Sequence, residues 1–168
     1  IDEGVKIDGY IGPGHVSTIT GSDMYRPVAE KYGLGVVISG FEPVDLLQSI
    51  LMLVRQIENN DQKVEIQYRR AVKTQGNPKA KKMMDEVFEL RGDWWRGLGM
   101  LPNSGLKLKE KYHHFDAEEM IPAGIEKTIE PKGCICGDIL KGIRSPKDCK
   151  LFAKVCTPLD PVGACMVS

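Results

Sequence analysis

The stretch Leu34-Gly-Val-Val-Ile-Ser39-Gly-Phe-Glu-Pro43 decides the fold of this chain. A bare apolar run bounded by glycine is typical of a strand buried in a parallel sheet. Pro43 stands where the first position of a helix should be, because its ring fixes φ and no N–H is needed there. Apolar residues then recur at steps of three and four and predict a helix to about residue 57: Leu46, Leu47, Ile50, Leu51, Leu53, Val54 and Ile57. A strand followed directly by a helix predicts α/β architecture.

The flanking sequence repeats this alternation of strand and helix patterns. The predicted elements are a strand at 5–11, helices at 22–32 and 77–92, and strands between 91 and 108 with a turn at 103–105. From about Pro122 the composition shifts to lysine, glycine and cysteine. We therefore predict an α/β domain over residues 1–121, with a parallel sheet flanked by helices, followed by a small cysteine-rich iron–sulfur module over residues 122–168.

Composition excludes two broad classes of function. Lys plus Arg and Asp plus Glu both number 23, so the formal net charge is zero and the electrostatic footprint of nucleic-acid binding is missing. The sequence contains no run of eighteen apolar residues, so it predicts no membrane span. The chain begins at Ile1 without an initiating methionine, so we expect a fragment of a longer protein.

All five cysteines lie in the last 35 residues: Cys134, Cys136, Cys149, Cys156 and Cys165. Thiolates bind soft metal ions and iron–sulfur clusters better than oxygen ligands do, so this crowding indicates metal. A disulfide framework is disfavoured by the odd count and by the lack of a signal peptide. Zinc remains an alternative, although no C-x2-C knuckle is present. An iron–sulfur cluster accepts irregular spacing, and it suits Cys136, Cys149 and Cys156 with the glycines and prolines between them.

Two loops follow predicted strands, at the end where open α/β sheets bind ligands. The first, Gly12-Pro-Gly-His-Val-Ser17, offers His15, which titrates near neutrality. The second, Ser39-Gly-Phe-Glu-Pro-Val-Asp45, offers Glu42 just before a helix N-terminus. If the two strands are neighbours, both side chains point into one crevice; taken alone, each is equally consistent with an ordinary turn or cap. No nucleophile or cofactor motif accompanies them, so a stand-alone enzyme is the weakest hypothesis.

Five separated motifs, in order, resemble the HypD family of [NiFe]-hydrogenase maturation factors. They are Gly12–Ser17, Ser39–Leu47, Gln67–Arg69, Trp95–Gly99 with Ser104-Gly105, and the stretch from Cys136 through Cys149, Phe152 and Cys156 to Met166-Val-Ser168. The resemblance spans essentially the whole chain. Members of the family are roughly twice as long, and this chain resembles their C-terminal half.

The resemblance implies a cytoplasmic assembly factor rather than a stand-alone enzyme. Proteins of this family work with the small protein HypC and with HypE to assemble an Fe(CN)2CO centre for the hydrogenase large subunit. They hold a [4Fe–4S] cluster that passes electrons to a cysteine pair in an N-terminal domain absent from this chain. A zinc-stabilised interaction or chaperone module without a redox role is the alternative function.

The resemblance also assigns residues. Cys136, Cys149 and Cys156 match the family's cluster cysteines, while the fourth ligand usually follows the Met-Val-Ser string and would lie beyond Ser168, leaving the module truncated. Cys165 and Cys134 are the nearby substitutes. His15 and Glu42 match the family's cleft motifs, where they would face the absent domain and help to position the iron or a partner.

Overall fold

The chain forms two compact units. The computed structural model describes residues 4–121, 124 and 131–167. One unit, here called the sheet unit, comprises residues 7–86; the other, the cysteine unit, comprises residues 1–6 together with 87–168. The module boundary predicted near Pro122 falls outside the described residues.

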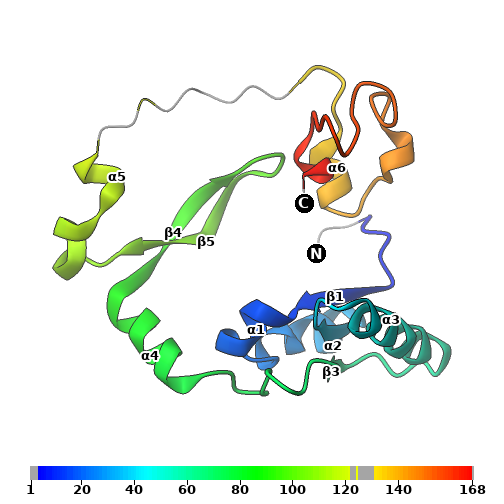
Figure 1. The fold of residues 1–168 in the computed structure, drawn as a ribbon, viewed down its shortest axis with the longest axis horizontal. Coiled ribbons are helices and arrows are strands. Elements are labelled where there is room, and N and C mark those ends of the chain that lie inside the picture. Colours follow the sequence, from blue (N-terminus) through cyan, green and yellow to red (C-terminus); the bar gives the residue numbers. More distant parts are fainter. Residues whose placement is uncertain (1–3, 122–123, 125–130, 168) are drawn as a thin grey trace. The chain divides into compact units, whose positions relative to one another are not determined.

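The sheet unit alternates strands and helices (Figure 1). Its elements are β1 (Gly9–Pro13), α1 (Gly14–Thr20), a 3-10 turn (Asp23–Tyr25), α2 (Arg26–Tyr32), β2 (Gly35–Ser39), α3 (Pro43–Glu58), β3 (Val64–Ile66) and α4 (Pro78–Val87). The three strands are parallel, in the order β1-β2-β3, with Tyr10 opposite Val36 and Val36 opposite Val64. The predicted α/β class is confirmed, including the adjacency of the first two predicted strands.

The centre of the sheet is buried on both faces. Val36 and Ile38 of β2 pack with Val72 on one face, and partly buried side chains complete this cluster: Tyr10, Tyr25, Val28, Val64, Ile66 and Tyr68. Val37, with no exposed surface, points to the opposite face, because side chains alternate along a strand. A short strand that is fully buried in this way gives the continuous apolar run seen in the sequence.

Helix α3 packs on the sheet face that carries Val37, where it contacts a glycine on each of two strands. A methyl group at Gly9 would lie 3.0 Å from Cδ2 of Leu53, and one at Gly35 would overlap Oε1 of Gln56. Glycine at both positions thus lets the helix approach the strands closely.

The surface that α3 turns towards the sheet is polar. Its buried residues are Asp45, Ser49 and Gln56. The apolar stripe faces outward, and Leu47 is 68% exposed. Amphipathic helices ordinarily bury the apolar stripe, so hydrogen bonds rather than apolar burial hold much of this helix to the sheet.

Three local expectations differ from the structure in the sheet unit. The glycine-rich stretch after the first strand is not a loop throughout, because α1 begins at Gly14. The helix predicted at 22–32 starts as a 3-10 turn, and α2 takes over at Arg26, since Pro27 fits only the first turn of a helix. The helix that begins at Pro78 ends at Val87 rather than near Gly92.

The cysteine unit contains an antiparallel ribbon and several short helices (Figure 1). Its elements are β4 (Phe88–Trp95), β5 (Gly99–Leu108), a 3-10 helix (Glu110–Phe115), α5 (Ala117–Met120), α6 (Cys136–Leu140) and 3-10 turns at Pro146–Asp148 and Ala164–Met166. The turn predicted at residues 103–105 is wrong, since these residues lie inside β5. They coincide with an irregular register opposite Arg91 and Asp93, and Asn103 has a φ of 52°. Such a bulge carries the same residue types as a turn.

Among the described residues, no helix combines the length and apolar character that a bilayer span requires. His113 and His114 are exposed on the 3-10 helix, and His113 pairs with Glu119.

A pair of alanine substitutions tests the outward-facing stripe of α3. Ile38→Ala removes a side chain with no exposed surface, and we expect it to lower the free energy of unfolding by about 2–5 kcal/mol. Leu47→Ala, on the exposed stripe, should change it by less than about 0.5 kcal/mol. Urea unfolding of the two variants beside the parent chain gives both values. A large loss for Leu47→Ala would show that the stripe is buried.

Candidate functional site

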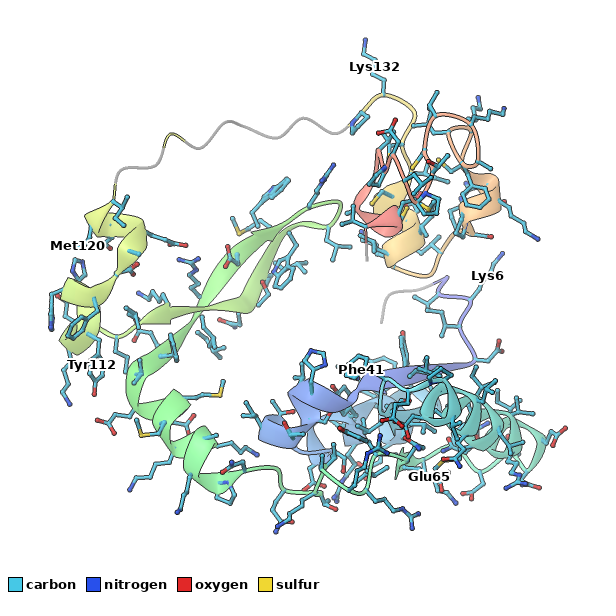
Figure 2. The ribbon with its side chains drawn as sticks, in the orientation of Figure 1. Lys6, Phe41, Glu65, Tyr112, Met120 and Lys132 are labelled. Atoms are coloured by element: carbon cyan, nitrogen blue, oxygen red, sulfur yellow. The ribbon has the colours of Figure 1, made fainter. Side chains whose placement is uncertain are left out.

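His15 and Glu42 lie at the same edge of the sheet. Strands β1 and β2 run parallel, so α1 and α3 both begin at the carboxyl ends of the strands, where α/β folds place their sites. His15 is the second residue of α1, and Glu42 immediately precedes α3. The ring of His15 packs against that of Phe41 with 5.1 Å between the ring centroids, and Phe41 marks this edge in Figure 2. The structure thus brings the two predicted residues to one edge, linked through Phe41.

A buried carboxylate organises the same edge. Asp45 is only 4% exposed, and Arg70 donates to both of its oxygens, at 2.9 and 2.6 Å. Gln67 adds a third hydrogen bond, from Nε2 to Oδ1 at 2.8 Å. Bidentate binding by a guanidinium is among the strongest arrangements that a carboxylate finds in proteins. These contacts tie the first turn of α3 to the segment that follows β3.

The electrostatics agree with this geometry. The hydrogen bonds from Arg70, and then from Gln67, lower the pKa of Asp45 from 3.8 to about 2. The hydrogen bond to Asp45 also raises the pKa of Arg70. Both groups are therefore charged throughout the physiological range, and Asp45 is unsuited to act as a general acid or base near neutrality.

Arg70 extends the cluster towards the exposed groups. Its guanidinium lies 4.3 Å from the centroid of the Tyr68 ring, and its Nη2 is 3.7 Å from Oε1 of Glu42. The Glu42 side chain remains 76% exposed. Glu42 and His15 are therefore accessible to a ligand or partner at this edge, together with the exposed Phe41, while Asp45 is buried beneath them.

Sequence reasoning missed Asp45, Gln67 and Arg70 as members of this cluster. An aspartate in the first turn of a helix is ordinarily explained by the helix dipole, which gives no reason to look for a partner 25 residues away. A usable signal was the polar run Gln67-Tyr-Arg-Arg70 directly after a strand-like segment. Polar side chains at strand ends meet at the sheet edge.

The cysteine unit gathers its thiols around one site. None of the five cysteines forms a disulfide bond, and Cys136 and Cys156 are 1% and 5% exposed. An apolar pocket is lined by Cys134, Cys149, Cys156 and Cys165 together with Phe152 and Met166. The sulfur of Cys136 accepts a hydrogen bond from the N–H of Cys165 at 3.2 Å, which places it beside the same group.

Backbone N–H groups point at three of the sulfurs. Besides Cys136, the sulfur of Cys156 accepts from the N–H of Val162 at 3.3 Å. The N–H of Leu151, followed by those of Ile135 and Phe152, donates to the sulfur of Cys149 and lowers the pKa of that thiol. At Cys149 these hydrogen bonds thus favour the thiolate, which is the form that binds metal.

Cys165 is in a different environment. Burial, and then the neighbouring thiols Cys136, Cys134 and Cys156, raise its pKa to about 11. The environment of Cys165 therefore differs from that of Cys149, whose pKa is lowered.

The donor chemistry fits a thiolate-bound centre. Within the described ranges, no group of three or more Cys, His, Asp or Glu residues is arranged as it stands to hold a metal ion. Nevertheless, Cys136, Cys149 and Cys156 each receive N–H donors and lie on loops and short helices of one small module. Iron–sulfur proteins tune their clusters with such N–H···S hydrogen bonds. These three residues could hold a cluster here.

Comparison with known proteins agrees with these observations. A family model described as "HypD: Hydrogenase formation hypA family" matches residues 1–168. The chain is 53% identical over 166 residues to hydrogenase maturation factor HypD1 of Bradyrhizobium diazoefficiens, covering 98% of this chain and 44% of that protein. It is 51% identical over 165 residues to hydrogenase maturation factor HypD of Azotobacter vinelandii, with the same coverage. The corresponding protein of Cupriavidus necator is 48% identical over 165 residues, again with that coverage. The chain thus spans less than half the length of these curated relatives.

Replacement of Asp45 tests the buried carboxylate through pH. Its pKa of about 2 in the folded chain lies below the ordinary 3.8, so its stabilising effect is present above pH 3.8 and is lost as the pH falls towards 2. We expect Asp45→Asn to unfold at lower urea than the parent at pH 7, and the difference between them to shrink across that window. Asp61→Asn, at the exposed Asp61–Lys63 pair, is the control and should change little. A gap for Asp45→Asn that is independent of pH would contradict the assignment.

Proposed function

This chain belongs to the HypD family of hydrogenase formation proteins, and from that membership we propose that it serves [NiFe]-hydrogenase maturation as part of an assembly scaffold. In this proposal the iron that receives two cyanides and one carbon monoxide is the cargo of the scaffold. The chain contributes a cysteine-bound redox centre and a sheet edge that faces the cargo or a partner. It acts with the remaining half of its own polypeptide rather than as a stand-alone enzyme.

The redox centre of the proposal is a [4Fe–4S] cluster on Cys136, Cys149 and Cys156. The observation that carries it is the set of backbone N–H donors aimed at these three sulfurs. When bound, the cluster would supply one-electron transfer towards thiols in the other half of the protein. The chain's own residues hold the thiolates, compensate their charge and surround them with apolar side chains such as Phe152 and Met166.

The two remaining cysteines, Cys134 and Cys165, are the candidates within this chain for the fourth ligand. Cys165 has a raised pKa, and its N–H already donates to the sulfur of Cys136. We take the fourth ligand to lie beyond Ser168, as the family resemblance implies, rather than at Cys165 or Cys134.

The sheet edge supplies the second part of the proposed function. Glu42 and His15 are exposed there, while the Asp45–Arg70 pair fixes the backbone that carries Glu42. We assign them to positioning the iron cargo or a partner, with HypC-like and HypE-like proteins as the partners and the cytoplasm as the compartment.

Metal analysis tests the cluster. In a full-length protein carrying this chain and reconstituted without air, we expect about four irons and four sulfides per chain. Cys136→Ser, Cys149→Ser and Cys156→Ser should each remove most of this iron, whereas Cys134→Ser and Cys165→Ser should retain it. Iron, sulfide and zinc assays with electron paramagnetic resonance measure the outcome. Stoichiometric zinc with no iron uptake would contradict the redox role and indicate a zinc ion that stabilises the fold instead.

Substitution at the sheet edge tests the positioning role separately. His15→Ala and Glu42→Gln in the full-length protein should lower hydrogenase maturation by about tenfold or more, because a misplaced reacting group costs rate steeply. Iron content and the free energy of unfolding should stay unchanged, since both side chains are exposed. Glu58→Gln, exposed at the opposite end of α3, is the matched control. Normal maturation by both variants would leave His15 and Glu42 with a structural role only.

A further inference from the structure

The tip of the β4–β5 hairpin contacts the cysteine that opens α6. The hairpin tip, residues 95–99, closes with the N–H of Leu98 donating to the carbonyl of Trp95 at 3.0 Å. Gly97 and Gly99 both have a φ of 81°, a conformation that favours glycine. A tight turn of this kind presents backbone rather than side chains to its neighbour.

Gly97 lies directly against Cys136. A methyl group on Gly97 would stand 3.2 Å from the sulfur of Cys136 and 3.3 Å from Cδ1 of Leu140. On the other side of the contact, a methyl group on Gly137 would overlap the carbonyl oxygen of Gly97. The two backbones meet without side chains between them, and Cys136 is left only 1% exposed. At Gly99, which has the same φ, a methyl group would meet nothing within 4 Å.

A second contact secures the tip. Nη2 of Arg96 donates to the carbonyl of Val162 at 3.1 Å, and the N–H of Val162 donates to the sulfur of Cys156. The tip therefore contacts the chain beside two of the three hydrogen-bonded sulfurs. It meets Gly137, next to Cys136, and Val162, whose N–H donates to Cys156. Trp95 stiffens the ribbon behind it by donating from Nε1 to Oγ of Ser104 at 2.8 Å.

An open pocket of about 450 Å³ adjoins this contact and is lined by Trp94, Leu98, Cys134, Cys136 and Asp138. Gly97, Gly99 and Gly137 also line this pocket, so it lies along the contact between the tip and α6 and brings solvent close to Cys136. A small outward movement of the tip would expose the Cys136 sulfur to the solvent in this pocket.

We propose that the hairpin tip is a fixed cover over the Cys136 sulfur, with Gly97 and Gly137 allowing the close contact and Arg96 holding it down. The inference rests on the proposed function for its purpose, because solvent exposure and N–H···S bonds set the lifetime and potential of a thiolate-bound cluster. Gly97, Gly137 and Arg96 are positioning residues, since they act through Cys136 and Val162.

Alkylation of the metal-free chain tests the cover without any cluster. The reduced chain is treated with iodoacetamide, and the labelling rate of each cysteine is read by mass spectrometry. Gly97→Ala and Gly137→Ala should raise the rate at Cys136 by roughly tenfold, because labelling follows local opening. Gly99→Ala carries the same φ penalty without the contact and should stay within about twofold of the parent. Cys149, whose sulfur is held by Leu151, Ile135 and Phe152, is the internal reference.

The outcomes separate the cover from general destabilisation. Equal labelling of Cys136 in the parent, Gly97→Ala and Gly137→Ala overturns the proposal, as does an equal increase in Gly99→Ala. If the glycine variants fail to fold by circular dichroism, Arg96→Ala, which adds no bulk, decides with the same assay. In a full-length protein that carries the cluster, Gly97→Ala and Gly137→Ala should also shorten the time for which the absorption of the cluster persists in air. Absence of any cluster would count against the proposed function and leave the alkylation result valid.

Discussion

The ion pair between Asp45 and Arg70 is the interaction on which the sheet unit depends. It joins the first turn of α3 to the segment after β3, and Gln67 links the same carboxylate to the backbone N–H of Gly40. Ser49 and Gln56 continue the polar contact surface along the helix. A buried charge is costly unless it is fully paired, so these bonds leave α3 few other positions on the sheet. The position of the edge that carries Glu42 follows from that constraint.

This constraint also explains how much of the sheet unit could be predicted from the sequence. The apolar run at residues 34–39 and the proline at 43 predicted β2 and the start of α3, because strand burial and helix initiation are local properties. Periodicity identified an apolar stripe on α3 but not the direction in which it points. That direction depends on Asp45, Gln56 and their partners, which lie 9 to 25 residues away. Exposed apolar patches of this kind are typical of interaction surfaces.

In the cysteine unit, composition indicates the chemistry while contacts between distant residues determine the geometry. The crowding of five thiols and the glycine-rich spacing between them are enough to predict a metal centre from the sequence alone. The turn predicted at residues 103–105 was wrong, because the same residue types form a bulge when a partner strand is present. The meeting of Gly97 and Gly137 joins positions 40 residues apart and has no local signal beyond the glycines themselves. Pairing across such separations is decided by packing, which a single sequence does not display.

Cys165 shows why counting thiols is not enough to name ligands. Its sulfur is buried among other thiols, which raises the pKa of its own side chain, while its backbone N–H donates to Cys136. One residue therefore carries a thiol whose pKa is raised, while its backbone N–H donates to a neighbouring sulfur. The backbone N–H of Cys165 thus supports a neighbouring sulfur, and this division between sulfurs and backbone donors gives the module its chemical asymmetry.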